Sequence, residues 1–213
     1  MSQSELLAEL EKRDLTKVKK NDDGLDTTYF LRVLNFIGET NKKRTAGNRA
    51  KTAKKRRKHY EKKEWDEYAE IVKASFLEED MSAQAVMSEV TDALGIGLQE
   101  FQMMHQGLMT NPASAEAIMA AQRGSYAPPD LKKKPTLSKQ KTMEVFKITQ
   151  KLSLDMMDML KKLEQSQGED QEKMLTFMIE QLKMHDEVFF STGVENEEFE
   201  DSLMIHMRTD PTV

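Results

Sequence analysis

The sequence contains no cysteine, which excludes disulfides, thiol nucleophiles, cysteine-held iron–sulfur clusters and zinc sites of the cysteine type. Glycine and proline are scarce, with nine and five residues among 213, so many short strands joined by frequent turns are nearly excluded. No apolar run approaches the roughly 20 residues that a membrane-spanning helix needs. These absences favour an all-α protein over a β-sandwich, a β-barrel or a membrane protein.

The first residues, MSQSELLAELEKRD, are polar and carry charges of both signs. They lack the apolar segment of a secretory signal, and their acidic residues are atypical of a mitochondrial transit peptide. We therefore expect a cytoplasmic location, the cytoskeleton included, with the nucleus as the alternative.

Charge is distributed unevenly along the chain. The net charge is −5, yet residues 42–63 contain 12 lysines and arginines and one acidic residue. Such a block of one sign predicts a basic, solvent-exposed helical arm on an acidic body. We expect residues 42–58 to be exposed, because burying unpaired cations is costly. Tyr68, Val72 and Phe76 follow at helical spacing and are predicted to be buried.

Apolar residues recur every three or four positions through most of the chain, which predicts helices. A capping box is indicated by Ser2 and Glu5, and Asp26 is expected to cap the second helix. The predicted helices cover residues 3–18, 27–39, 43–78, 82–94, 98–109, 114–122, 138–165, 170–190 and 195–208.

Three of the five prolines lie in residues 124–137, GSYAPPDLKKKPTL, which is typical of a linker. We therefore predict an N-terminal helical module over 1–123, which includes the basic arm 42–63, and a C-terminal helical module over 138–213.

An internal similarity links the two predicted modules. Residues 89–109 (EVTDALGIGLQEFQMMHQGLM) match residues 187–207 (EVFFSTGVENEEFEDSLMIHM) at seven positions without a gap. The pattern predicts a helix, a glycine that ends it, an aliphatic residue and a second helix whose phenylalanine closes the corner. The corner residues are Gly95, Ile96 and Phe101 in the first copy, and Gly193, Val194 and Phe199 in the second. We interpret the match as a duplication.

The corner resembles that of BART-like domains, small helical bundles that occur in effectors of Arf-like GTPases and in a ciliary protein. The resemblance covers about a dozen residues in each copy. It consists of Gly95-Ile96 followed by Phe101, and of Gly193-Val194 followed by Phe199. It implies a helical-bundle shape.

Motifs of catalysis and metal binding are absent from the sequence. None of the glycines forms a phosphate-binding or dinucleotide-binding loop, and no G-x-S-x-G sequence occurs. The four histidines (His59, His105, His185 and His206) are too far apart in sequence to bind a metal from one helix face. We expect a protein that is not an enzyme and that has no cofactor, no metal site and no small-molecule substrate.

The basic arm is the strongest chemical signal. The predicted anion-binding residues are Lys42, Lys43, Arg44, Lys54, Lys55, Arg56, Arg57 and Lys58, spaced like a bipartite nuclear localisation signal. Such a segment binds an acidic protein surface, an import receptor or nucleic-acid phosphates. Aromatic residues are not interleaved with these cations, so stacking on single-stranded bases is not indicated.

Methionine is the second unusual feature, since 15 of the 16 methionines follow residue 80. Methionine fills irregular helical cores, and it also lines surfaces that adapt to partner helices. Together these features predict a helical adaptor, scaffold or structural subunit that contacts other protein subunits. It would use its apolar helix faces for those contacts and the arm for an acidic partner. The alternative is a nuclear protein whose arm contacts nucleic-acid phosphates.

Overall fold

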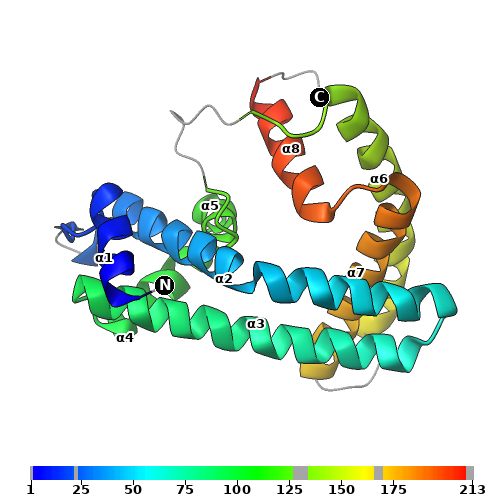
Figure 1. The fold of residues 1–213 in the computed structure, drawn as a ribbon, viewed down its shortest axis with the longest axis horizontal. Helices are drawn as coiled ribbons and strands as arrows, with labels where there is room; N and C mark the ends of the chain where they lie inside the picture. Colours follow the sequence, from blue (N-terminus) through cyan, green and yellow to red (C-terminus); the bar gives the residue numbers. More distant parts are fainter. Residues whose placement is uncertain (1, 22–23, 127–133, 166–169, 210–213) are drawn as a thin grey trace. The chain divides into compact units, whose positions relative to one another are not determined.

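A computed structural model describes residues 2–21, 24–126, 134–165 and 170–209 (Figure 1). Over these residues the chain forms eight α-helices and one two-residue hairpin, which confirms the predicted all-α class. The elements are α1 (Gln3–Lys12), β1 (Lys20–Asn21), β2 (Gly24–Leu25), α2 (Thr27–Lys62), α3 (Trp65–Leu94), α4 (Leu98–Met109), α5 (Pro112–Gln122), α6 (Lys139–Gln165), α7 (Asp170–Thr192) and α8 (Asn196–Thr209). β1 and β2 are antiparallel, with Lys20 opposite Leu25.

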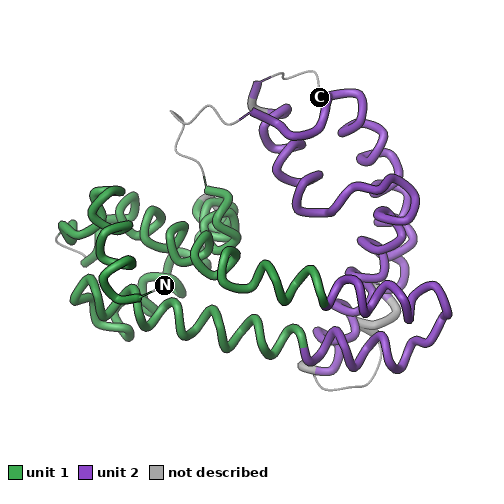
Figure 2. Tube along the Cα trace, viewed as in Figure 1, with its two compact units in different colours: residues 1–51, 75–130 green, residues 52–74, 131–213 purple. Residues whose placement is uncertain are grey.

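The chain divides into two compact units that interleave along the sequence (Figure 2). Unit 1 comprises Met1–Lys51 and Ser75–Asp130, and unit 2 comprises Thr52–Ala74 and Leu131–Val213. The long helices α2 and α3 therefore contribute to both units. The predicted modules follow chain order and stay a prediction, and residues 127–133 of the predicted linker lie outside the described residues.

Helix α1 begins at the predicted capping box. The Ser2 hydroxyl accepts from the Glu5 backbone N–H, and the Glu5 carboxylate accepts from the Ser2 backbone N–H. The helix ends at Lys12 rather than at residue 18, because Asp14 adopts a φ of 53°. This left-handed residue turns the chain so that Leu15 enters the core.

Helix α2 begins as predicted, since the Asp26 carboxylate accepts from the Tyr29 N–H at 2.8 Å. The helix does not end near residue 39, as its glycine had suggested, but continues to Lys62. Gly38 lies inside the helix where another backbone passes close by. A Cβ atom at this position would lie 2.4 Å from the Gln122 carbonyl oxygen. The absence of a side chain therefore permits a close crossing of α2 and the end of α5.

The helix predicted over 43–78 is interrupted by a turn at Lys63, which has a φ of 59°. The Lys63 and Glu64 N–H groups donate to the carbonyls of Tyr60 and His59, the pattern of a Schellman motif. This motif usually contains glycine, so the sequence carried no signal for it. The predicted start of a helix at Ser82 is also wrong, because α3 runs uninterrupted through that residue.

Each unit has its own apolar core. In unit 1, residues from α1 to α5 pack together, and the rings of Phe30 and Phe101 lie 4.7 Å apart. In unit 2 one cluster of buried apolar residues consists of Val145, Val188, Val194 and Phe199 among the described residues.

The stripe predicted on α3 is only partly buried. Tyr68 and Val72 are buried as predicted, whereas Phe76 is 45% exposed, so that prediction is wrong. Beyond Val72, α3 meets α2 through polar pairs, Arg49 with Glu79 and Asn41 with Ser82. The next buried apolar residue of α3 after Val72 is Val86, so Phe76 lies in a stretch of this helix with no buried apolar residue.

Candidate anion-binding surface on α2

The basic segment (residues 42–63) is helical as far as Lys62, and its arginines and lysines have different surroundings. Each of its four arginines contacts a carboxylate of the same unit. The contacts are Arg44 with Glu89, Arg49 with Glu79, Arg56 with Asp186, and Arg57 with Asp186 and Glu195. The arginines therefore serve as internal links between helices.

In unit 1 the arginine pairs connect α2 to α3. Arg44 donates two hydrogen bonds to the Glu89 carboxylate, with lengths of 3.0 and 2.7 Å. These bonds raise the pKa of Arg44 and lower the pKa of Glu89. The guanidinium of Arg49 lies 2.7 Å from the Glu79 carboxylate. Both pairs are partly exposed, so each is expected to stabilise the fold by about 0.2–1 kcal/mol.

In unit 2 a carboxylate of α7 holds two arginines of α2. Asp186 has no exposed surface. Its oxygens accept from Arg56 at 2.7 and 2.8 Å, from Arg57 at 2.9 Å and from the Tyr68 hydroxyl at 2.8 Å. We call these four residues the buried charge cluster. The two oxygens of Asp186 thus accept four hydrogen bonds, which compensates for the loss of water.

Further contacts complete the surroundings of the buried charge cluster. The remaining nitrogens of Arg57 donate to Glu195 at 2.8 and 2.7 Å, and its guanidinium carbon lies 3.4 Å from the centroid of the Phe189 ring. Burial alone would lower the pKa of Arg56, but the hydrogen bonds and charge of Asp186 outweigh it and raise that pKa. Burial, reinforced by Asp186, raises the pKa of Tyr68. The arginines therefore stay charged and Tyr68 stays protonated at neutral pH.

The predicted exposure of residues 42–58 is wrong for part of the segment. Thr45 is buried, and six residues are only partly exposed: Lys42, Arg49, Thr52, Ala53, Arg56 and Arg57. The side chains of Arg56 and Arg57 are only 12% and 13% exposed, because Asp186 and its neighbours surround them. Only three of the five consecutive cations of the predicted localisation signal are exposed. Binding of an anionic partner by the segment stays a prediction.

Those three exposed cations are Lys54, Lys55 and Lys58, which we call the lysine face. Lys58 lies three and four residues after the other two, so all three side chains share one side of α2. None forms an ion pair with a described residue. Unlike the arginines beside them, these lysines are available to a partner.

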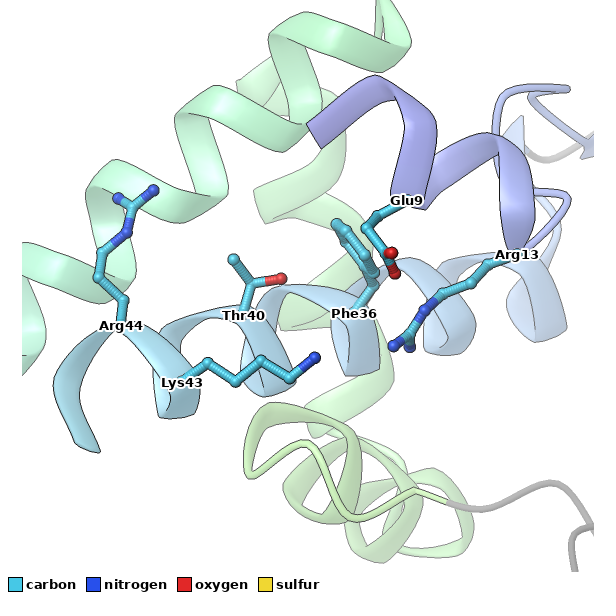
Figure 3. A pocket seen from close by; sticks show the side chains of 6 residues that line it. All are labelled: Glu9, Arg13, Phe36, Thr40, Lys43 and Arg44. Carbon is cyan, nitrogen blue, oxygen red and sulfur yellow. The ribbon is translucent and has the colours of Figure 1, made fainter. Parts of the chain in front are cut away.

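The unit 1 end of the segment borders a cavity between α1 and α2. The cavity has a volume of about 240 Å³ and is lined by Glu9, Arg13, Phe36, Thr40, Lys43 and Arg44 (Figure 3). Lys43 and Arg44 were expected to bind an anion, whereas the sequence did not indicate a role for the other lining residues. Lys42, the third predicted residue of this end, is partly buried.

The two glycines of the predicted corners have the expected conformation. Gly95 and Gly193 have φ values of 64° and 72° at the ends of α3 and α7, so the prediction of positive φ is confirmed. The first corner is a Schellman motif, in which the Ile96 N–H donates to the Thr91 carbonyl. In the second, the Gly193 N–H donates to the Phe189 carbonyl instead.

The apolar residues of the corners are buried in both copies. Ile96 and Phe101 belong to the core of unit 1, and Val194 and Phe199 belong to the core of unit 2. Equivalent positions thus close equivalent corners. The duplication itself stays a prediction.

Sequence reasoning missed Asp186, although a signal for it exists. Leu182 and Phe189 are spaced to share one side of α7, and Asp186 lies on that same side, four residues after Leu182 and three before Phe189. A carboxylate on an apolar helix face needs a buried cation nearby. The arginines of the basic segment were the available candidates.

Several methionines are exposed, which supports the sequence prediction of methionine-containing surfaces. Met81, Met103 and Met174 are about 60% exposed or more. A methionine-lined groove for a partner helix stays a prediction.

The parts of the chain that the structure describes contain no group of three or more histidine or acidic side chains placed to bind a metal ion. Over the same residues, no helix has the length and apolar character needed to cross a bilayer. Comparison with protein-family models, curated proteins and solved structures finds no significant match to the chain.

Proposed function

We propose that the protein is a non-enzymatic adaptor or structural subunit that binds an acidic surface of a partner protein through the lysine face. The proposal depends on one observation. Within a single basic segment the arginines pair inside the unit, while Lys54, Lys55 and Lys58 are exposed and form no ion pair with a described residue.

The buried charge cluster supports this proposal by holding the lysine face in place. Arg56 and Arg57 tie α2 to α7, so Lys54, Lys55 and Lys58 project from a fixed helix. A partner with carboxylates at a matching spacing would bind without first ordering this backbone. A preordered surface loses less conformational entropy on association, so a given set of contacts gives a higher affinity.

An acidic protein fits the lysine face better than nucleic acid does. Arginine forms the paired hydrogen bonds that favour phosphate, and the neighbouring Arg56 and Arg57 use those donors inside the unit. No aromatic residue lies between the three lysines to stack on bases. Exposed methionines elsewhere support additional apolar contacts with protein partners.

The proposal is tested by measuring binding to labelled probes by fluorescence anisotropy. The probes are a 20-residue polyglutamate peptide and a 20-base-pair duplex DNA, each at 50 and 150 mM salt. We expect the peptide to bind and the triple variant K54Q/K55Q/K58Q to lose about tenfold in affinity, which corresponds to roughly 1.4 kcal/mol.

A matched control removes three exposed lysines of the same unit outside the lysine face. The variant K134Q/K147Q/K151Q makes the same change in net charge and should bind the peptide within twofold of the natural chain. Equal losses in the two variants would show that binding follows net charge and would contradict the proposal. Tighter binding to DNA than to the peptide at 150 mM salt would favour the nucleic-acid alternative.

A further inference from the structure

The cavity of unit 1 brings together three hydrogen-bond donors of different kinds. Figure 3 shows the Lys43 ammonium, the Arg13 guanidinium and the Thr40 hydroxyl pointing toward a common space beside Phe36, whereas the Arg44 guanidinium points away. Arg13 is the residue that directly follows α1, whereas Thr40, Lys43 and Arg44 belong to α2. Two of the three donors are cationic, and a cation that faces a cavity attracts an anion to the extent that its charge is not already balanced.

The charges around the cavity are compensated unevenly. Arg13 is 2.7 Å from the Glu39 carboxylate, and Arg44 pairs with Glu89. Lys43, by contrast, forms no ion pair with a described residue. The ammonium of Lys43 is therefore the uncompensated charge of this cavity.

Among the described residues, Glu9 is the only acidic one that lines the cavity. Its carboxylate lies 3.6 Å from Lys12, and both side chains are well exposed to water. The pair with Lys12 is weak, and Figure 3 shows the Glu9 carboxylate beside Phe36, on the side of Arg13. The Glu9 charge therefore repels an anion in the cavity. Removal of the Glu9 charge should raise the affinity for an anion, whereas removal of the Lys43 charge should lower it.

The site is already organised without a ligand. The Arg13 guanidinium is held by Glu39 and lies 5.1 Å from the centroid of the buried Phe36 ring. Arg32 donates to the Arg13 carbonyl, which fixes the backbone at the end of α1. A ligand therefore meets a guanidinium of defined position rather than a freely moving one.

We propose that this cavity binds the phosphate group of a small phosphorylated molecule. A phosphate monoester offers three acceptor oxygens, which match a guanidinium, a hydroxyl and an ammonium that approach from separate directions. A carboxylate has only two oxygens. With a water volume of about 30 Å³, the cavity equals roughly eight waters, which leaves room for a short organic body beside the phosphate. This site is separate from the lysine face and does not depend on the proposed adaptor function.

The test is a titration of the ¹⁵N-labelled protein with glycerol 3-phosphate, followed by amide chemical shifts at low salt, with glycerol as the uncharged control. We expect shifts to concentrate in residues 9–13 and 36–44. Lys43→Gln should weaken binding about tenfold and Thr40→Val about threefold. Glu9→Gln should strengthen binding about twofold, because it removes the opposing charge.

The matched control is Lys51→Gln, which removes another exposed lysine of α2 that forms no ion pair with a described residue and does not line the cavity. The affinity of Lys51→Gln for glycerol 3-phosphate should stay within twofold of that of the natural chain. The thermal midpoints of all variants should equal that of the natural chain. Equal weakening by Lys51→Gln and Lys43→Gln would overturn the proposal. Tighter binding of a phosphoserine decapeptide than of glycerol 3-phosphate would overturn the assignment to a small molecule.

Discussion

The two units use corners of the same sequence pattern around different interiors. Unit 1 closes its corner with Phe101 in an extensive apolar core, where the ring contacts Phe30. Among its described residues, unit 2 closes the equivalent corner with Phe199 in a smaller apolar core, and Arg57 of the buried charge cluster pairs with Glu195, the residue that follows Val194 in this corner. A short helix–glycine–helix pattern is therefore compatible with both interiors. It needs only a glycine at positive φ, a buried aliphatic residue and a buried phenylalanine, all within about a dozen residues.

The interiors of the two units differ in which substitutions they tolerate. An apolar core tolerates substitutions that conserve volume, whereas a buried ion pair requires each charge to keep its partner. Unit 2 is thus expected to depend strongly on Asp186, and unit 1 to depend on close packing. The single tryptophan, Trp65, lies in unit 2, with the Lys183 ammonium 4.6 Å from its ring centroid. Its fluorescence can therefore follow unit 2, while circular dichroism follows both units.

The largest effect is expected from Asp186→Ala. Removal of the carboxylate leaves Arg56 buried without its ion-pair partner, which should lower the free energy of unfolding by about 3–5 kcal/mol. The measurement is urea unfolding followed by circular dichroism, which reports on both units, and by Trp65 fluorescence, which reports on unit 2. Glu89→Ala, which removes a partly exposed pair in unit 1, is the control and should cost no more than about 1 kcal/mol. Similar losses in the two variants would remove the contrast between the interiors.

Close packing in unit 1 is tested by Gly38→Ala. The added Cβ would meet the Gln122 carbonyl, so we expect a loss of about 1–3 kcal/mol, seen by circular dichroism more than by Trp65 fluorescence. Gly47→Ala is the matched control in the same helix, with nothing within 4 Å of the added atom. It should stabilise the protein by about 0.5–1 kcal/mol. The same sign for both variants would contradict the close crossing at Gly38.

The hydroxyl of Tyr68 provides a pH-dependent test of the buried charge cluster. Tyr68→Phe removes one hydrogen bond to Asp186 and should cost about 1.5 kcal/mol at pH 8. The folded-state pKa of Tyr68 is raised, so its contribution is complete below the unfolded value of about 10 and is lost as the pH rises beyond it. Urea unfolding at pH 8 and pH 11 should therefore show less alkaline loss in the variant than in the natural chain. Equal losses would indicate that Tyr68 does not titrate with folding.

The smallest effects are expected at the two corners. Gly95→Ala and Gly193→Ala should each lower the free energy of unfolding by about 1 kcal/mol. An alanine is strained at positive φ even where its Cβ contacts nothing. Thermal unfolding of the two single variants provides the comparison. Costs that differ by more than about 1 kcal/mol would show that the corners are not equivalent.

The sequence was most informative where a structural requirement was local. The capping box at Ser2, the cap at Asp26 and the left-handed glycines Gly95 and Gly193 all depend on residues within one or two turns. Each prediction was confirmed. Periodicity also identified most helices, because their apolar residues face one core.

Predictions failed where the cause lay far away in the sequence. Gly38 suggested a helix end, but its role is the approach of residues more than 80 positions later. The exposure of Arg56 was misjudged because its partner Asp186 is 130 residues away. The turn at Lys63 had no glycine to reveal it. The cavity beside Lys43 likewise requires α1 and α2 to meet, which no local pattern indicates.

The interleaving of the units has a consequence for synthesis on the ribosome. Residues 52–74 leave the ribosome long before α7, so Arg56 must wait for 130 further residues before Asp186 is made. At about 5–20 residues per second, this interval lasts roughly 7–26 s. During that time Arg56 and Arg57 lack their partners Asp186 and Glu195, so they are as free of these ion pairs as the lysine face is. Arg56 and Arg57 therefore become distinct from the lysine face only when the C-terminal helices emerge. Until then the nascent chain attracts polyanions most strongly.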